Sequence, residues 1–200
     1  LLHLLPLTTR GACTRVEATP PCAGVQTAGQ VYPQLYFAYL LLHARITPGL
    51  VRGFSCGVQY EAAPNSGVDV FEWRLCADAD APTAGWPGSG GGNRIVWNAE
   101  HSQGLEPGGA GTGVMAAGGY FYLAAYTPDV MRVTAHPGSG RATLLDALGN
   151  ELDIPATGPS PFGTLAFSAA GTLQGYVPCV AAVPAGTTTW GSIKAMFGRQ

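Results

Sequence analysis

Charge is scarce in this chain. Only 11% of its 200 residues are charged, the formal net charge is −2, and lysine occurs once, at Lys194. A basic stripe for nucleic acid is therefore missing from the sequence, and we expect no nucleic-acid partner. A weakly charged surface is also poorly protected against association. Self-assembly explains this composition, and a Gly/Ala-rich surface without any such role explains it equally well.

Long apolar runs and recognisable catalytic arrangements are also missing. No run of about 20 apolar residues occurs, so we expect no membrane span. The Gly-rich stretches lack the lysine that ends a phosphate-binding loop. Asp78 and Asp80 offer oxygen ligands for calcium, but they do not follow the EF-hand pattern. The histidines are scattered along the sequence. We therefore expect no enzyme, no catalytic residue, no metal site and no cofactor.

Alternating residues predict β-strands. Phe54, Cys56, Val58 and Tyr60 alternate with more polar neighbours, and the segment 71–75 does the same. A period of two is typical of half-buried strands. Glycine (29) and proline (16) disfavour long helices, and 46% hydrophobic residues favour a packed core. Short strands with turns about every ten residues predict an all-β fold, an antiparallel β-sandwich or jelly roll.

The predicted sandwich occupies residues 31–182. Residues 1–30 are expected to be an irregular N-terminal extension, and 183–200 a C-terminal tail. In the tail, Trp190, Ile193 and Phe197 follow one another at spacings of three and four, which predicts a short amphipathic helix. We expect that helix to pack on its own sandwich or, alternatively, to dock on another subunit or on a secretion apparatus.

Five cysteines indicate an oxidising compartment. They contain no C-x-x-C pair, so we expect two disulfides and one remaining thiol among Cys13, Cys22, Cys56, Cys76 and Cys179. The pairing stays open. Cys13 and Cys22 are close in sequence, whereas Cys56 and Cys76 fall on opposite faces of their strands. The predicted location is extracellular or at the surface of a bacterial cell.

Two predicted strands, 31–44 and 114–126, are apolar on both faces. A strand in a two-sheet sandwich should have one solvated face, so these need a third layer or a strand from a neighbouring copy. The apolar residues 1–7 either pack in their own core or are donated to another copy. The candidate interface residues are Leu1, Leu2, Leu4, Leu5, Leu7, Tyr36, Leu40, Leu42, Tyr120, Tyr122, Tyr126 and Trp190. Trp86, between Gly85 and Pro87, is the candidate for contact with a ligand.

Three segments together resemble the cohesin-like sandwiches of bacterial exported proteins. They are 54–61 (FSCGVQYE), 118–126 and 141–154 (RATLLDALGNELDI), and the resemblance covers roughly residues 31–155. It implies a cohesin-like sandwich fold. The segments 75–97 and 188–197 (TTWGSIKAMF) also resemble a family of secreted proteins of environmental bacteria that carries no known activity.

Two functions follow. The first is a non-enzymatic exported structural protein that self-assembles into an extracellular filament or cell-surface layer, with copies of itself as partners. The alternative is a cohesin-like adhesion module that binds a polysaccharide or another surface protein. Both are compatible with a β-sandwich, which by itself does not define a function.

Overall fold

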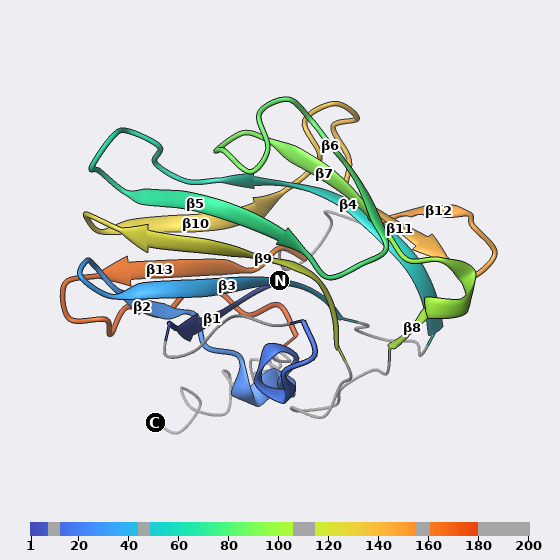
Figure 1. Cartoon of the computed structure of the whole chain (residues 1–200), viewed down its shortest axis with the longest axis horizontal. Coiled ribbons are helices and arrows are strands. Elements are labelled where there is room, and N and C mark those ends of the chain that lie inside the picture. Colours follow the sequence, from blue (N-terminus) through green and yellow to red (C-terminus); the bar gives the residue numbers. More distant parts are fainter. Residues whose placement is uncertain (8–12, 44–48, 106–114, 155–160, 180–200) are drawn as a thin grey trace, which may run out of the picture.

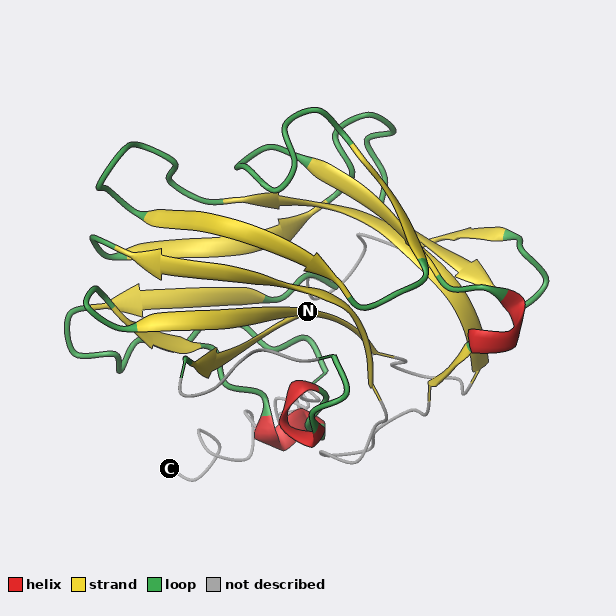
Figure 2. Ribbon diagram, in the orientation of Figure 1, coloured by secondary structure: helices red, strands yellow, loops and turns green. Residues whose placement is uncertain are grey.

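The fold is a two-sheet β-sandwich. The computed structural model describes residues 1–7, 13–43, 49–105, 115–154 and 161–179. Within these residues, the helical elements are three short 3-10 turns: η1 (Val16–Ala18), η2 (Cys22–Gly24) and η3 (Ala99–His101). Strands make up nearly all the rest of the regular structure (Figure 2). The predicted all-β sandwich is confirmed, and no described helix is long and apolar enough to cross a membrane.

The smaller sheet has four antiparallel strands in the order β1-β3-β9-β5. Its strands lie roughly along those of the larger sheet (Figure 1). The strand bounds are β1 (Leu2–Pro6), β3 (Leu35–His43), β9 (Met115–Ala125) and β5 (Val68–Leu75). The first strand of the chain therefore forms one edge of this sheet, next to β3.

The larger sheet follows the order β12-β11-β4-β10-β13-β2, and the long strand β4 also pairs with β7 and β8, while β6 pairs with β7. Among the described pairs of this sheet, β13 and β2 are parallel and the others are antiparallel. The bounds are β2 (Ala28–Gln30), β4 (Gly49–Gln59), β6 (Ala79–Pro82), β7 (Gly92–Val96), β8 (Gln103–Leu105), β10 (Asp129–Thr134), β11 (Thr143–Asp146), β12 (Glu151–Asp153) and β13 (Thr164–Ser168). Residues 1–30, expected to be irregular, thus supply β1 and β2, one strand to each sheet.

The alternation in β4 correctly predicts its inward face. Phe54, Cys56, Val58 and Tyr60 are all buried in the core between the sheets. In β5 the alternation is interrupted, because the register against β9 shifts between Val70 and Glu72. This β-bulge places one extra residue in the strand and re-aims its side chains. The expectation that Phe71 shares a face with the residues two and four positions later is therefore wrong.

The chain itself covers the second face of β3 and β9. A second buried cluster lies there, in which Phe37, Tyr39 and Leu41 of β3 pack with Cys22 and Cys179. The turns η1 and η2 contribute to this cover through Ala18, Cys22 and Val25. The third layer that the sequence called for is therefore present, and it comes from segments before β2 and after β13.

Two disulfides and one free thiol are present, as the cysteine count predicts. The bonds join Cys13 to Cys76 and Cys22 to Cys179, with Cα–Cα distances of 5.3 and 5.8 Å. Cys56 is free and buried. Both pairings that the sequence suggested are thus wrong. Cys56 points into the core between the sheets. The Cys22–Cys179 bond joins the two segments of the third layer, and the Cys13–Cys76 bond joins the segment before η1 to the residue after β5.

Candidate functional site

Aromatic side chains from three strands meet on the outward side of the smaller sheet. We call this group the outer aromatic face; it consists of Phe37 and Tyr39 of β3, Tyr120 and Tyr122 of β9, and Phe71 of β5. Ring centroids along the group lie 5.2 Å apart for Phe37–Tyr120, 5.4 Å for Tyr39–Tyr120, 5.9 Å for Phe37–Tyr122 and 5.2 Å for Phe71–Tyr122. The rings therefore form one continuous apolar surface across three strands.

Exposure increases along this face from β3 toward β5. Tyr39 is fully buried and Phe37 is 7% exposed, because the third layer covers that side. Tyr120 and Tyr122 are half-buried, and Phe71 is 48% exposed. Beside Phe71, the exposed side chains of Arg74 and Glu72 form an ion pair at 2.7 Å. The result is an apolar centre next to a charged margin.

The bulge in β5 creates the exposed end of this face. Glu72 rather than Phe71 pairs with Tyr122 in the ladder, so Phe71 is the inserted residue. Without the shift, strict alternation would place Phe71 on the core side with Trp73. The sequence alone could not show that Phe71 faces outward. A bulge depends on the register with a partner strand about 50 positions away in the chain, and the pattern within one strand carries no information about that register.

A second aromatic contact lies at the end of β9. Tyr126 stacks on Tyr32 with ring centroids 5.3 Å apart and an interplanar angle of 23°. The Tyr32 N–H donates to the Ala125 carbonyl oxygen at 2.6 Å, which fixes the segment before β3 beside the end of β9. Tyr32 is 56% exposed. The candidate Tyr126 is half-buried and has Tyr32 as its stacking partner.

Most of the other candidate interface residues are buried within the chain. Leu2 and Leu4 of β1 lie in the core between the sheets, and so do Tyr36, Leu40 and Leu42 of β3. Leu1 belongs to the cluster under the third layer, with the half-buried Leu5 and Leu7 against it. Trp190 lies outside the described residues.

Trp86 packs inward rather than away from its loop. Its ring lies 5.0 Å from that of Trp73 and 5.2 Å from that of Phe121, measured between centroids. The side chain is half-buried, and its Nε1–H is buried without a hydrogen-bond partner in the structure. Trp86 therefore closes one side of the core, and Phe71 is the more exposed aromatic residue.

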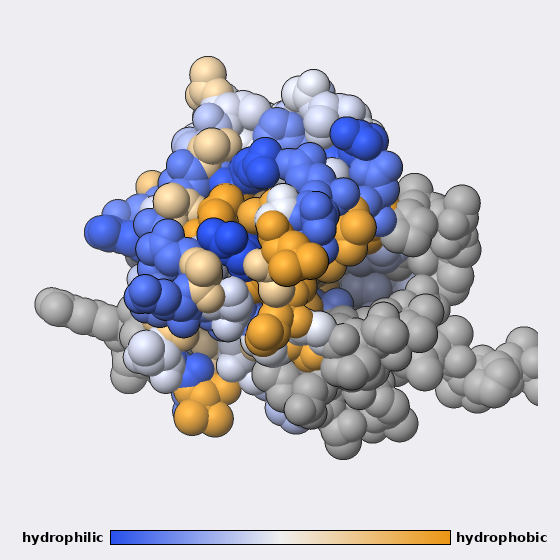
Figure 3. Space-filling view, turned by 90° about the vertical axis from the view of Figure 1, so that its right-hand side faces the viewer, coloured by the Kyte–Doolittle hydropathy of each residue, from blue (hydrophilic) through white to orange (hydrophobic). Residues whose placement is uncertain are grey.

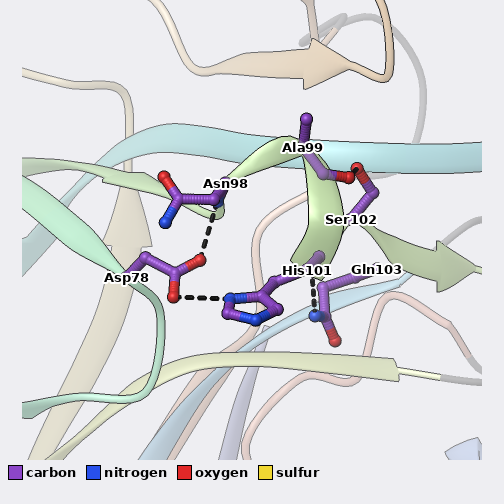
Figure 4. Close-up of polar contacts among 6 residues, drawn as sticks. All are labelled: Asp78, Asn98, Ala99, His101, Ser102 and Gln103. Atoms are coloured by element: carbon purple, nitrogen blue, oxygen red, sulfur yellow. Dashed lines mark hydrogen bonds and ion pairs between the residues drawn. The ribbon is translucent and has the colours of Figure 1, made fainter.

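Asp78 and His101 form the most prominent exposed polar contact (Figure 4). Asp78 Oδ1 lies 2.7 Å from His101 Nδ1, and the Asn98 N–H donates to Oδ2 at 2.7 Å. The Asn98 N–H and the His101 imidazole together hold the pKa of the Asp78 carboxyl below its ordinary value. The neighbouring Ser102 hydroxyl donates to the Ala99 carbonyl oxygen at 2.8 Å, not to the imidazole. This contact fixes η3 to the turn before β6.

The two acids weighed as calcium ligands serve separate contacts. Whereas Asp78 binds η3, Asp80 Oδ2 accepts hydrogen bonds from Trp73 Nε1 at 3.1 Å and from Asn93 Nδ2 at 2.8 Å. Asp80 therefore supports the core at β7. Among the described residues, the acids do not gather into a group that could hold an ion.

The expectation that catalytic sequence patterns are missing is wrong at one place, since residues 53–57 (GFSCG) match the G-x-S-x-G pattern of a nucleophile elbow. Such an elbow requires a sharp turn from a strand into a helix, with the serine exposed at its tip. Here Ser55 lies in the middle of β4, paired with Arg94 of β7 on one side and Thr143 of β11 on the other. It is 9% exposed. The backbone geometry therefore gives Ser55 a place in the sheet and not the position of a nucleophile.

Hydrophobic side chains also gather at the end of the sandwich that carries β8, β11 and β12 (Figure 3). On these elements and the adjoining start of β4, the most exposed large apolar side chains within strands are Leu50 at 56% and Leu152 at 49%. Leu148, in the turn between β11 and β12, is 85% exposed. The exposed side chains named here are all leucines, in contrast to the outer aromatic face.

No protein-family model matches the chain, and no curated protein sequence matches it. A solved structure similar to this fold is the cohesin module from a family 33 glycoside hydrolase of Clostridium perfringens ATCC13124. The match covers 72% of this chain and 91% of that module, with 12% identity and a TM-score of 0.44. That module is a cohesin, and the sequence resemblance described above is to cohesin-like sandwiches.

Proposed function

We propose that this chain is a non-catalytic binding module of an exported protein, and that a partner protein docks on the outer aromatic face. The observation that carries the proposal is Phe71, which is 48% exposed and stands at a bulge against the half-buried ring of Tyr122. Exposed aromatic side chains in the centre of an apolar patch, with charges at its margin, are typical anchors of protein interfaces.

The ring geometry favours a protein over a polysaccharide. A sugar chain stacks best on rings that lie side by side in one plane. The planes of Phe71 and Tyr122 are 53° apart, those of Phe37 and Tyr122 46°, and those of Phe37 and Tyr120 76°. Tilted rings of this kind present gaps between their edges, into which side chains of a partner can insert.

A polymer built by strand donation receives less support. β1 pairs with β3 over five residues of its own chain, from Leu2 opposite Leu40 to Pro6 opposite Tyr36. The apolar second faces of β3 and β9 suggested a donated strand, but the third layer covers that of β3 and part of that of β9. The two disulfides favour an oxidising compartment, which supports export.

A site-specific photo-crosslinking experiment tests the proposal. A photoreactive phenylalanine analogue replaces Phe71 in the full chain, and in a matched control it replaces Leu152, which is 49% exposed. Each protein is mixed with the proteins secreted by the source cells and irradiated, and adducts are identified by mass spectrometry. The partner found at position 71 is then purified and titrated with wild type, F71A, Y122A and L152A.

We expect F71A to weaken binding about 30-fold, as a central aromatic anchor does, and L152A to leave it within about twofold. Equal losses in F71A and L152A would disprove the assignment to the outer aromatic face. Binding to a glycan array that F71A abolishes, with no protein adduct, would assign the face to a polysaccharide. If the wild-type protein formed particles much larger than one chain, and F71A consisted of single chains, the outer aromatic face would be assigned to self-assembly.

A further inference from the structure

Three metal-binding side chains converge beneath the third layer. Cys22 comes from η2, His43 ends β3, and Cys179 follows β13. Their sulfur and imidazole nitrogen atoms all lie within 4.8 Å of one another, and His43 Nε2 is 3.3 Å from Cys22 Sγ. Cys22 and Cys179 form a disulfide, and of the two disulfides in the described part of the chain it is the one that has a histidine beside it. The other places Cys13 Sγ 3.6 Å from the Leu75 carbonyl oxygen.

We propose that reduction of the Cys22–Cys179 disulfide by a thiol reductant converts this cluster into a site for one zinc-class divalent cation. In the first step, two reductant thiols become a disulfide and supply two electrons and two protons, the Cys22–Cys179 bond breaks, and two protein thiols form. In the second step, the cation binds both sulfurs as thiolates and His43 through the Nε2 lone pair, and two protons are released. A water molecule completes the tetrahedron.

The backbone spacing suits both states. Two thiolates on one tetrahedral zinc ion lie about 3.8 Å apart, since each Zn–S bond is about 2.3 Å. The Cα atoms of Cys22 and Cys179 are 5.8 Å apart, a distance from which two short side chains reach either a common bond or a common ion. Small rotations of the two side chains are enough to pass from one state to the other.

Cys22 and Cys179 lie in an apolar and largely buried part of the structure. Cys22 and Cys179 are 1% and 6% exposed. The apolar members of the same cluster include Ala18, Val25, Leu41, Met115 and Val177. His43 Nε2 already faces Cys22 Sγ at 3.3 Å, so the imidazole nitrogen is in position to serve as the third ligand. His43 is itself half-buried.

The site has a clear structural role. The Cys22–Cys179 bond ties the two segments of the third layer together over the face of β3 and β9. If the bond were broken without replacement, this cover would lose its covalent tie. A cation held by both cysteines and by the last residue of β3 would join the same two segments and add a bond to the sheet. The metal would therefore take over the function of the disulfide when thiols are present.

Metal titration of the full chain tests the proposal. The chain is reduced with dithiothreitol, the reductant is removed under argon, and Co²⁺ or Zn²⁺ is added. We expect one ion per chain, tetrahedral cobalt absorption with a sulfur-to-metal charge-transfer band, and a higher melting temperature than that of the reduced chain without metal. The oxidised chain should show none of these effects. Loss of a residue that only hydrogen-bonds to a metal ligand weakens binding about 10–100-fold. H43A removes a ligand itself and should therefore weaken Zn²⁺ binding by at least as much.

The C13S/C76S double variant is the matched control and should bind as wild type does. C22S/C179S should bind no ion. If reduction unfolds the chain, the proposal predicts that Zn²⁺ restores the folded state, because an ion that binds the folded form stabilises it. Binding of less than one ion in the reduced chain, failure of Zn²⁺ to stabilise or restore it, or equal binding by C22S/C179S would each overturn the proposal.

Discussion

Leu2 lies opposite Leu40 in the antiparallel pair that β1 forms with β3. Both side chains are 1% exposed and both belong to the core between the sheets. The sheet edge that a strand from another copy would complete is therefore occupied by the chain's own first strand. We expect the purified protein to sediment with the mass of a single chain at micromolar concentration. A concentration-independent dimer or polymer in sedimentation equilibrium would contradict this.

Removal of a β1 side chain should destabilise the single chain. Leu4 is 1% exposed, and truncation of a buried leucine to alanine costs about 2–5 kcal/mol because a cavity remains. L4A should therefore lower the free energy of unfolding by that amount in a urea titration. L148A is the control, since Leu148 is 85% exposed and its loss should stay within about 0.5 kcal/mol. Equal stabilities of the two variants would show that β1 does not pack in the core.

His3 should make the fold less stable in mild acid. Burial lowers its pKa; its Nδ1 accepts the Gln26 N–H at 2.9 Å, and its Nε2–H donates to the Glu17 carbonyl oxygen at 3.0 Å. Below about pH 6.5 the unfolded chain therefore takes up a proton that the folded chain resists. The free energy of unfolding should be level above that pH and fall as the pH decreases through it.

The variant H3Q isolates this effect. The pKa of His43 is also lowered by burial, so H3Q should reduce the loss of stability between pH 7 and 5 without abolishing it. Urea titrations of wild type and H3Q at pH 7, 6 and 5 measure how steeply the free energy of unfolding of each protein depends on pH. A slope in H3Q as steep as in wild type would mean that His3 is not the residue responsible.

Cys56 should be inert in the folded protein. It is 4% exposed, and burial raises the pKa of its thiol to about 12, so almost no thiolate is present at pH 8. Ellman's reagent should therefore detect no thiol in the native protein. In guanidinium chloride without reductant it should detect one per chain, because the other four cysteines are bonded. A native protein that reacts at once would place Cys56 at the surface.

The Cys13–Cys76 bond should contribute strongly to stability. It closes a loop of 63 residues, for which chain entropy predicts a contribution of about 4 kcal/mol. C13A/C76A should lose an amount of that order in urea titrations, and a non-reducing peptide map of wild type should recover the 13–76 and 22–179 pairs. Recovery of a 13–22 or 56–76 peptide would refute the pairing.

Local patterns predicted the parts of this fold that depend on neighbouring residues. The inward set Phe54, Cys56, Val58 and Tyr60 follows from a period of two within β4. The need for a third layer followed from the two apolar faces of β3 and β9. The source of that layer did not, because a sequence pattern records that a face is apolar and not which segment covers it.

Other features depend on pairing across long distances. Phe71 is exposed because β5 bulges against β9, and Cys22 finds its partner 157 residues away. Residues 172–177, which follow β13, form no strand in the structure. Both edges of β13 are already paired, one with β10 and the other with β2.

The parallel pair of β2 with β13 has a consequence for how the protein folds. A strand from the beginning of the chain, Ala28–Gln30, must wait for Thr164–Ser168 before its hydrogen bonds can form. The cover over the smaller sheet likewise needs Cys179. Contacts of such long sequence separation slow folding, because the loop must be closed before any stabilising contact forms. Until residues 164–179 have been synthesised, the nascent chain therefore lacks the partner strand of β2 and part of the cover over β3.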